Sequence, residues 1–537
     1  MLRYIIFTAD RFTKRLIVPS QIILFLLSII LLYLFKERII RFISEIPRNK
    51  KKILTAIFFL GLLLRIFLPI HEHVMFIDEP WHMESAKNII QTGNQDYYQK
   101  PIGWPFVLTI PFLIFGINNY VAIYTNIFIG SLTIFLIYFL ALKVTKSHVA
   151  PLFSALLLAI AGDHIKWSAT AEANLSGLFF IILGIILAIT KKNNNMEYIL
   201  GFSATIFFAS FRPESYTLIP IYLLFNIKYF KKIISDKRIL IAFLLVGMLT
   251  IPNLIRVLTF KIPYSPLSII TFENNVNSPA STIISSFLMN LTSLLGLFHN
   301  DFFSIPLLIA FTIGVIYSLK NKEKDSKVLY VYLFLLMYIY LFGVRYFYNM
   351  GGGTFQYSKS RFYMMFYPTT LVVSSLIFKR YPYNKVKINK NKQRLKNYIT
   401  LILSILIVLT QVLSLSQVPS MLSGHKLSTI VLSQIHNDIP DNCIVVSPMP
   451  AEISAVNNIK TKFVEDFIQD IEFNENVTNY LNQECYFYYE GRICNDHLQR
   501  PYCEKMHEHF YMSEKKEYTD GDKSYFIYSI EMPKNTK

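Results

Sequence analysis

Two adjacent carboxylates, Asp78 and Glu79, are the residues of this chain whose types and positions best suit chemistry. They follow the apolar run 58–70 within a polar stretch, and Lys100-Pro101 comes later in the same stretch. A positioned carboxylate can take a proton from a hydroxyl group, and an ammonium group can hold an anion. Two acids and a lysine beyond an apolar run therefore predict an active site that faces one side of a bilayer.

The composition is typical of a polytopic membrane protein. Of the 537 residues, 53% are hydrophobic and 15% aromatic, and the mean hydropathy is +0.38. The net charge of +18 does not indicate nucleic-acid binding, because the lysines and arginines cluster in short loops between apolar runs, as the positive-inside rule requires. The first run, 16–35, lacks a small-residue cleavage site and is predicted to be a retained anchor.

Apolar runs divide the chain into about 12 predicted transmembrane helices, since a span needs roughly 20 apolar residues. Two further stretches, 103–117 and 281–298, contain helix-breaking or polar residues and are predicted to lie at the interface or to re-enter. The predicted spans are 16–35, 53–71, 120–143, 148–164, 174–190, 197–211, 214–230, 238–258, 303–320, 328–347, 361–379 and 398–417.

The loop charges predict the orientation. The basic loops 36–52, 191–195, 228–238, 320–327 and 379–396 fall on one side if the spans alternate, and that side is the cytoplasm. Basic residues before the first span conflict with this count, so the side of the N-terminus stays open. The unusual polar residues then converge on the outer side: Asp78, Glu79, Lys100, His164, Glu172, Arg212, Glu214, Tyr357 and Arg361.

Residues 418–537 differ from the rest. Helix-like and strand-like segments alternate, with strands expected at 443–447 and near the chain end, which predicts a small extracytoplasmic α/β domain. All four cysteines lie here: Cys443, Cys485, Cys494 and Cys503. Two disulfides of open connectivity are the favoured interpretation; free thiols, or a metal site with His497, are the alternatives.

Segments 77–93, 97–116, 121–144 and 164–184 resemble the GT-C membrane glycosyltransferases, specifically the family of protein O-mannosyltransferases and lipid A aminoarabinose transferases. Segments 212–215 and 356–377 match more loosely. The specific feature is the acidic pair in the first outer loop with the following Lys-Pro. Lys-Pro-Ile stands where the family usually has Lys-Pro-Pro. A Trp-Trp-Asp signature is absent from the sequence, which therefore does not resemble an oligosaccharyltransferase subunit.

The resemblance implies a GT-C-like transmembrane catalytic domain over 1–417, with outer loop 71–119, followed by the domain 418–537. It also implies a glycosyltransferase, mannosyltransferase-like, that moves a hexosyl or pentosyl group with inversion. The donor would be a polyprenyl phosphate of the dolichyl-phosphate kind, and the acceptor a hydroxyl of a protein, lipid or glycan on the extracytoplasmic face of the cell membrane.

The resemblance also suggests roles for individual residues. Asp78 is the first choice for the base and Glu79 the second, while Glu172 would orient the acceptor or share the base role. No cofactor is certain; the carboxylates offer ligands for a divalent cation, whereas the resemblance favours catalysis without metal. The donor phosphate would be held by Lys100, Arg212 and Arg361, and the substrates contacted by Tyr97, Tyr98, His164 and Tyr357.

Structural interpretations stand beside these roles. Asp78 can be a helix N-cap and Glu79 a partner of the helix dipole. Lys100 can anchor the chain at the interface, Arg212 can pair with Glu214, and Arg361 can mark a span boundary. Histidines near Asp78, among them His82, are more often surface residues than metal ligands. Two other protein classes compete with the enzyme: a transporter or lipid flippase, and a non-catalytic binding scaffold.

Overall fold

The structure is a computed structural model. Its first part describes residues 2–69, 79–95, 101–229, 235–253, 303–320, 325–342, 363–378 and 390–418. Its last part describes residues 438–440, 443–448, 453, 460–464, 467–468, 471, 485–490, 494, 500–520 and 523–533.

The regular structure described up to residue 418 is entirely helical, and each of the twelve predicted spans overlaps a helix. Side-chain caps mark several starts: Asn118, Asn194 and Asp236 accept hydrogen bonds from backbone amides of α5, α9 and α12. The longer helices are α1 (Leu2–Ser44), α2 (Arg48–Phe67), α3 (Glu79–Thr92), α4 (Gly103–Phe115), α5 (Asn119–Thr145), α6 (Val149–Ala159), α7 (Gly162–Ser168), α8 (Ala173–Ile189), α9 (Asn195–Ala209), α10 (Leu218–Phe225), α12 (Lys237–Met248), α15 (Ile305–Lys320), α16 (Lys327–Phe342), α18 (Tyr367–Ser374) and α19 (Lys390–Ser414).

Not all of these helices are long enough to span a bilayer alone. Among the described residues, three are long and apolar enough: Arg15–Ser44 within α1, α5, and Asn397–Ser414 within α19. The predicted span 148–164 is broken, since α6 ends at Ala159 and α7 starts at Gly162 with a bend of 57°. The pair counts as a fourth candidate, so the total of about 12 spans stays a prediction.

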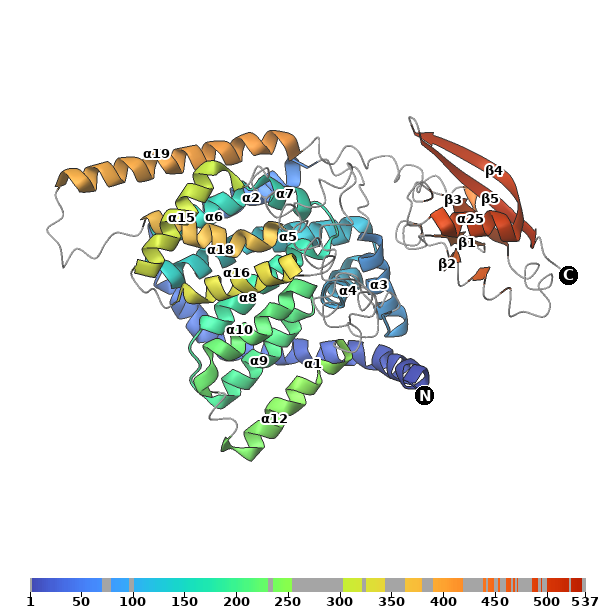
Figure 1. Ribbon diagram of the computed structural model, residues 1–537, viewed down its shortest axis with the longest axis horizontal. Coiled ribbons are helices and arrows are strands. Elements are labelled where there is room, and N and C mark those ends of the chain that lie inside the picture. Colours follow the sequence, from blue (N-terminus) through green and yellow to red (C-terminus); the bar gives the residue numbers. More distant parts are fainter. Residues whose placement is uncertain are drawn as a thin grey trace, which may run out of the picture.

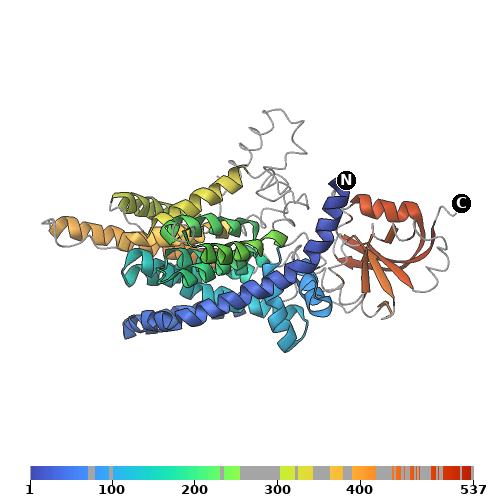
Figure 2. The same cartoon turned by 90° about the horizontal axis from the view of Figure 1, so that it is seen from below.

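The helices form one body around a common apolar core (Figures 1 and 2). The central helix α5 packs against α2, α6 and α8, and α1 lies along α9. α1 and α19 flank the body and expose large apolar side chains, such as Leu32 at 57%, Leu401 at 56% and Leu413 at 63%. Apolar side chains on the outside of such a bundle suit contact with lipid.

The C-terminal part is a five-stranded sheet in the order β2-β1-β3-β5-β4 (Figure 1). The strands are β1 (Ile444–Ser447), β2 (Lys460–Phe463), β3 (Tyr486–Glu490), β4 (Phe510–Asp520) and β5 (Lys523–Pro533). β1, β2 and β3 are parallel, whereas β5 joins β3 and β4 in antiparallel pairing. With helix α25 (Arg500–His509), the sheet confirms the predicted small α/β domain.

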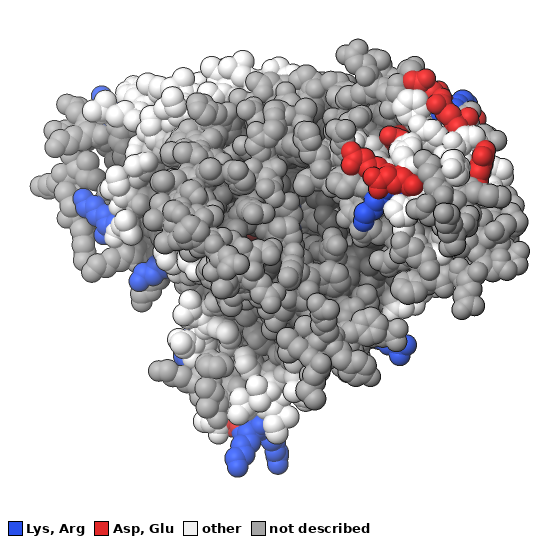
Figure 3. All heavy atoms as spheres, turned by 45° about the vertical axis from the view of Figure 1, so that its right-hand side comes forward, with Lys and Arg blue, Asp and Glu red and all other residues white. Residues whose placement is uncertain are grey.

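Two disulfides cross-link this domain, which confirms the prediction that the four cysteines form two disulfide bonds. Cys443 pairs with Cys485 at the starts of β1 and β3, and Cys494 pairs with Cys503 in α25. The domain has 18 acidic and 11 basic residues, so it is net acidic and the net positive charge of the chain comes from residues 1–417. Figure 3 shows acidic side chains gathered on the C-terminal part of the surface.

Candidate functional site

Glu79 is the first residue of α3, where a carboxylate is stabilised by the helix dipole. Its side chain is fully buried, and Oε1 accepts a hydrogen bond of 2.9 Å from the backbone N–H of Ala171. The interpretation of Glu79 as a first-turn acidic residue is thus confirmed, and the same carboxylate also binds a distant turn. Asp78 directly precedes it in the chain but lies outside the described residues.

The turn that Glu79 contacts, Thr170–Glu172, joins α7 to α8. Glu172 is the N-cap residue of α8, with an extended backbone at φ −71° and ψ 147°, and its side chain is 1% exposed. The side-chain amide of Asn174 donates a long hydrogen bond of 3.4 Å to Oε2 of Glu172. The predicted acidic residue Glu172 therefore lies at the beginning of a buried helix.

Two side chains from other helices hold the backbone of the same turn. Asn126 of α5 donates from Nδ2 to the carbonyl oxygens of Thr170 at 2.6 Å and Glu172 at 3.1 Å. The indole N–H of Trp104, in the first turn of α4, donates to the carbonyl of Ala171 at 2.6 Å. Three consecutive residues of the turn are thus bound by side chains from α3, α4 and α5.

Arg212 follows α9 and forms a bidentate ion pair with Glu214. Its Nε lies 3.0 Å from Oε2 and its terminal nitrogen 3.1 Å from Oε1. Glu214 is fully buried, and the hydroxyl of Tyr340 donates to it at 3.4 Å. The predicted Arg212–Glu214 pair is confirmed. Gly177 of α8 makes room for the arginine, since a Cβ there would meet Cδ of Arg212 at 2.6 Å.

The first turn of α4 connects the two regions. While Trp104 binds the carbonyl of Ala171, the backbone N–H of Gly103 donates to the carbonyl of Ser210 at 2.9 Å, two residues before Arg212. Glu172 and Gly177 are five residues apart on α8, about 7.5 Å along the axis. Glu79, Glu172 and Arg212 therefore gather at one end of the helical body.

His164 of α7 belongs to a different buried cluster. Its Nδ1 lies 2.7 Å from a terminal nitrogen of Arg65, and its ring stacks on Tyr367 of α18 with centroids 6.5 Å apart. Because a guanidinium only donates, Nδ1 must accept, which leaves the ring proton on Nε2. Arg65 also donates to the carbonyls of Leu158 and Ala159 at the end of α6, at 3.1 and 3.2 Å.

The other predicted site residues lie outside the described residues. In the sequence, Asp78 adjoins Glu79, and Lys100 comes three residues before Gly103. Within the described part of the chain, no three His, Cys, Asp or Glu side chains come together as metal ligands. The predicted residues outside the description are Asp78, Tyr97, Tyr98, Lys100, Tyr357 and Arg361.

Sequence reasoning missed Arg65, Asn126 and Trp104. The first two had a usable signal, because a charged or amide side chain within an apolar run usually faces a site or a buried polar network. Arg65 lies in the run 53–71 and Asn126 in the run 120–143. For Trp104 the sequence offers no such signal, since an aromatic residue in an apolar stretch is ordinary.

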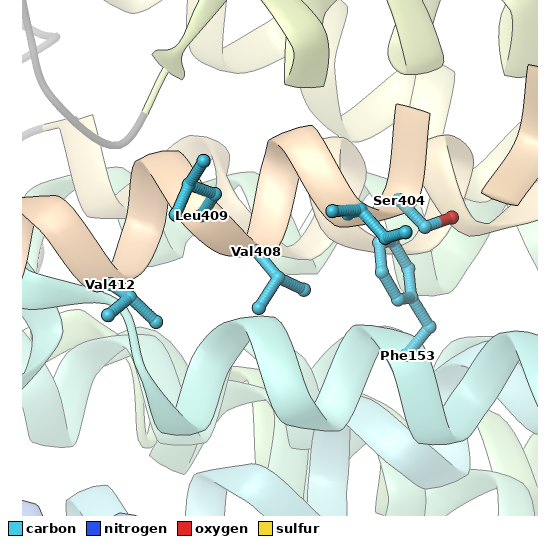
Figure 4. A pocket seen from close by; sticks show the side chains of 6 residues that line it. Phe153, Ser404, Val408, Leu409 and Val412 are labelled. Atoms are coloured by element: carbon cyan, nitrogen blue, oxygen red, sulfur yellow. The ribbon is translucent and has the colours of Figure 1, made fainter. Parts of the chain in front are cut away.

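An apolar pocket of about 410 Å³ lies between α6 and α19 (Figure 4). Phe153 of α6 forms one wall, and the residues from α19 form the other. At the C-terminal end of α19, beyond the pocket, Ser414 packs against Gly162 at the start of α7. The residues that line it are Phe153, Ser404, Ile405, Val408, Leu409 and Val412.

Solved structures provide the comparison for this fold. No protein-family model matches the chain, and no curated protein matches its sequence. ArnT from Cupriavidus metallidurans bound to undecaprenyl phosphate matches with a TM-score of 0.54 at 9% identity, over 88% of this chain and 97% of that one. ArnT in the apo state matches with a TM-score of 0.51, also at 9% identity and over the same shares of the two chains.

The archaeal oligosaccharyltransferase AglB from Archaeoglobus fulgidus, in complex with an inhibitory peptide and a dolichol-phosphate, matches with a TM-score of 0.47 at 13% identity. That match covers 89% of this chain and 74% of AglB. The two ArnT matches show that this chain has the ArnT fold. They confirm the fold that the resemblance to GT-C glycosyltransferases implied.

Proposed function

We propose that this chain is a membrane glycosyltransferase that moves a sugar from a polyprenyl-phosphate donor to a hydroxyl acceptor on the extracytoplasmic face. One observation carries the proposal: Glu79, from a distant segment, binds the turn that carries Glu172, at one end of a bundle with the ArnT fold. The solved ArnT structure holds undecaprenyl phosphate. The basic loops support placing this end on the outer side.

The proposed reaction is a single displacement with inversion. The acceptor oxygen forms a bond to the anomeric carbon while the bond from that carbon to the phosphate oxygen breaks, and the bonding electrons leave with the polyprenyl phosphate. Asp78 takes the proton of the acceptor hydroxyl. Because the leaving group is a phosphate, it needs positive charge rather than a general acid, and Lys100 and Arg361 supply it.

Arg212 has a different place in this scheme from the one that the sequence suggested. Two of its nitrogens bind Glu214, and its side chain packs against Gly177. A guanidinium that already forms a bidentate ion pair with a buried carboxylate is a weaker candidate for phosphate binding than an arginine or lysine without such a pair. We therefore assign Arg212 to holding the end of α9 against α8, and the phosphate contact to Lys100 and Arg361.

Glu79 and Glu172 act in support of Asp78 in this proposal. Glu79 uses one carboxylate oxygen to accept from Ala171, which fixes the residue directly after Asp78. Glu172, the last residue of the Thr170–Glu172 turn, orients the acceptor. The hydrocarbon tail of the donor suits an apolar surface, and the pocket beside α19 offers one.

A transfer assay in nanodiscs tests the proposal. Wild type and Asp78→Asn receive radiolabelled polyprenyl-phosphate sugars with a membrane extract as acceptor. We expect transfer from one donor by wild type and a loss of at least about 100-fold in Asp78→Asn, the lower bound for a missing general base. Folded wild type that turns over none of the donors would favour a transporter or a binding scaffold instead.

A further inference from the structure

Asn126 lies in the N-terminal third of the mostly apolar central helix α5, and its side chain is fully buried. Its Nδ2 lies 2.6 Å from the carbonyl oxygen of Thr170, 3.1 Å from that of Glu172 and 3.4 Å from that of Trp167. A single amide group thus faces the carbonyls at the end of α7 and at the beginning of α8.

The turn leaves helical geometry between Ser168 and Ala173, so the carbonyl of Thr170 lies outside both helical ladders. The carbonyl of Glu172, the N-cap residue, starts the ladder of α8, and Asn126 gives it a second donor. In a membrane-embedded bundle, an unpaired carbonyl costs free energy because water does not replace the partner. Ala171, in the middle of the turn, is satisfied by Trp104 and Glu79, and Asn126 serves the residues on both sides of it.

The amide therefore fixes the backbone that carries Glu172. The carbonyl of Glu172 is bound by Asn126 while its side chain leaves the N-cap position of α8 towards Asn174. The direction of an N-cap side chain depends on its own φ and ψ, which are extended here. A shift of this backbone moves the carboxylate with it.

We propose that Asn126 is a positioning residue for Glu172, a role that rests on the proposed glycosyl transfer. It touches no substrate; it holds the Thr170–Glu172 turn so that the Glu172 carboxylate meets the acceptor in a fixed orientation. A misplacement of about 1 Å costs about 100-fold in rate. Because the donor phosphate is held elsewhere, loss of Asn126 acts on the acceptor step alone.

The test compares Asn126→Asp and Asn126→Ala with wild type in the full chain. Aspartate has the shape of asparagine but offers at most one O–H donor in place of the two N–H donors, and alanine removes the group without adding charge. Ser131→Ala is the matched control, because Ser131 is equally buried in α5 but donates only to Ile127 of its own helix. Binding of undecaprenyl phosphate as a probe measures the fraction of folded protein.

We expect both Asn126 variants to bind the probe like wild type, to show a higher KM for the acceptor and to lose about 100-fold in kcat. The KM for the donor stays unchanged, and Ser131→Ala behaves like wild type. Wild-type kinetics in both variants would overturn the role. So would a loss that only follows the amount of probe bound, because that is the signature of a purely structural residue.

A double-mutant cycle with Glu172→Gln decides whether Asn126 acts through Glu172. If it does, the double variant Asn126→Ala/Glu172→Gln is no slower than the worse single variant. Independent losses that multiply would overturn the inference and leave the glycosyltransferase proposal intact, and so would wild-type kinetics in Glu172→Gln. If wild type transfers sugar from none of the donors, both proposals fail together.

Discussion

The carboxylate of Glu79 and the backbone amide of Ala171 form a hydrogen bond of 2.9 Å between residues that are 92 positions apart. The bond joins the first residue of α3 to the turn that carries Glu172. Both groups are buried, and the carboxylate also lies at the positive end of the α3 dipole. A bond of this kind needs an acceptor oxygen at position 79 and does not need a titrating group.

Glu79→Gln is therefore expected to keep most of the transfer activity, whereas Glu79→Ala loses it. The amide oxygen of glutamine can accept from Ala171, but alanine leaves that buried N–H unpaired at a cost of about 1–3 kcal/mol. Initial rates of sugar transfer measure the difference. If Glu79 were the catalytic base, the Gln variant would instead be as inactive as the Ala variant.

Glu84→Gln is the control for Glu79, because Glu84 is also buried in α3 and pairs with Lys87 at 3.8 Å one turn away. Its contact stays within the helix, so its neutralisation leaves the Thr170–Glu172 turn in place. Activity lost equally in Glu84→Gln and Glu79→Gln would point to a general need for acidic charge in α3.

The apolar runs of the sequence predicted where helices form, because a bilayer-spanning segment has to be apolar over its length. It missed the break in 148–164, which depends on a distant residue: Arg65 of α2 binds the carbonyls of Leu158 and Ala159 that the break exposes. Strand β4 was missed as well, since its charged sequence has low strand propensity and only its pairing with β5 along its length makes it a strand.

The candidate site was predictable only as a set of residue types. Loop charges indicated that Glu79, Glu172 and Arg212 lie on one side, and the structure places these three at one end of the bundle. The sequence had no means to show that Glu79 binds Ala171 or that Arg212 is committed to Glu214, because both contacts depend on packing between helices. His164 was grouped with the acids, yet its contacts are with Arg65 and Tyr367.

Arg65→Leu is expected to destabilise the helical body by about 2 kcal/mol or more, since at least two buried carbonyls and Nδ1 of His164 lose their donor. The thermal midpoint of the purified protein in detergent, followed by fluorescence-detected size exclusion, measures it. Arg48→Leu, in the exposed first turn of the same helix, is the control. Equal midpoints for the two variants would contradict a capping role for Arg65.

Peptide mapping without reductant is expected to recover Cys443 linked to Cys485 and Cys494 linked to Cys503 from protein made in cells. Such bonds persist in an oxidising compartment, so their presence supports an extracytoplasmic C-terminal domain. Removing one by a Cys443→Ser/Cys485→Ser double variant should cost about 2–5 kcal/mol of domain stability. Four free thiols in protein alkylated before lysis would place the domain in the cytoplasm and reverse the proposed orientation.

The C-terminal domain also carries a pH-dependent contact. Nζ of Lys516 on β4 lies 2.8 Å from both carboxylate oxygens of Asp438, and the hydroxyl of Tyr518 donates to the same group. Burial raises the pKa of Asp438, but the hydrogen bonds from Lys516 and Tyr518 and the charge of Lys516 outweigh it, so the pKa is lowered from 3.8. A lowered pKa stabilises the folded state above the unfolded pKa, and this stability disappears as the pH falls through the folded value.

Asp438→Asn should therefore loosen β4 at pH 5–7 and make no difference once the pH has fallen below the lowered pKa of Asp438 and its carboxyl is protonated. The pair is partly exposed, so the expected effect is under about 1 kcal/mol. Amide hydrogen exchange of peptides from β4, compared between variant and wild type at each pH, measures it. Glu531→Gln on β5, an exposed carboxylate, is the control. A difference between Asp438→Asn and wild type that persists unchanged to the lowest pH would mean that the shape of the side chain, and not its charge, holds β4.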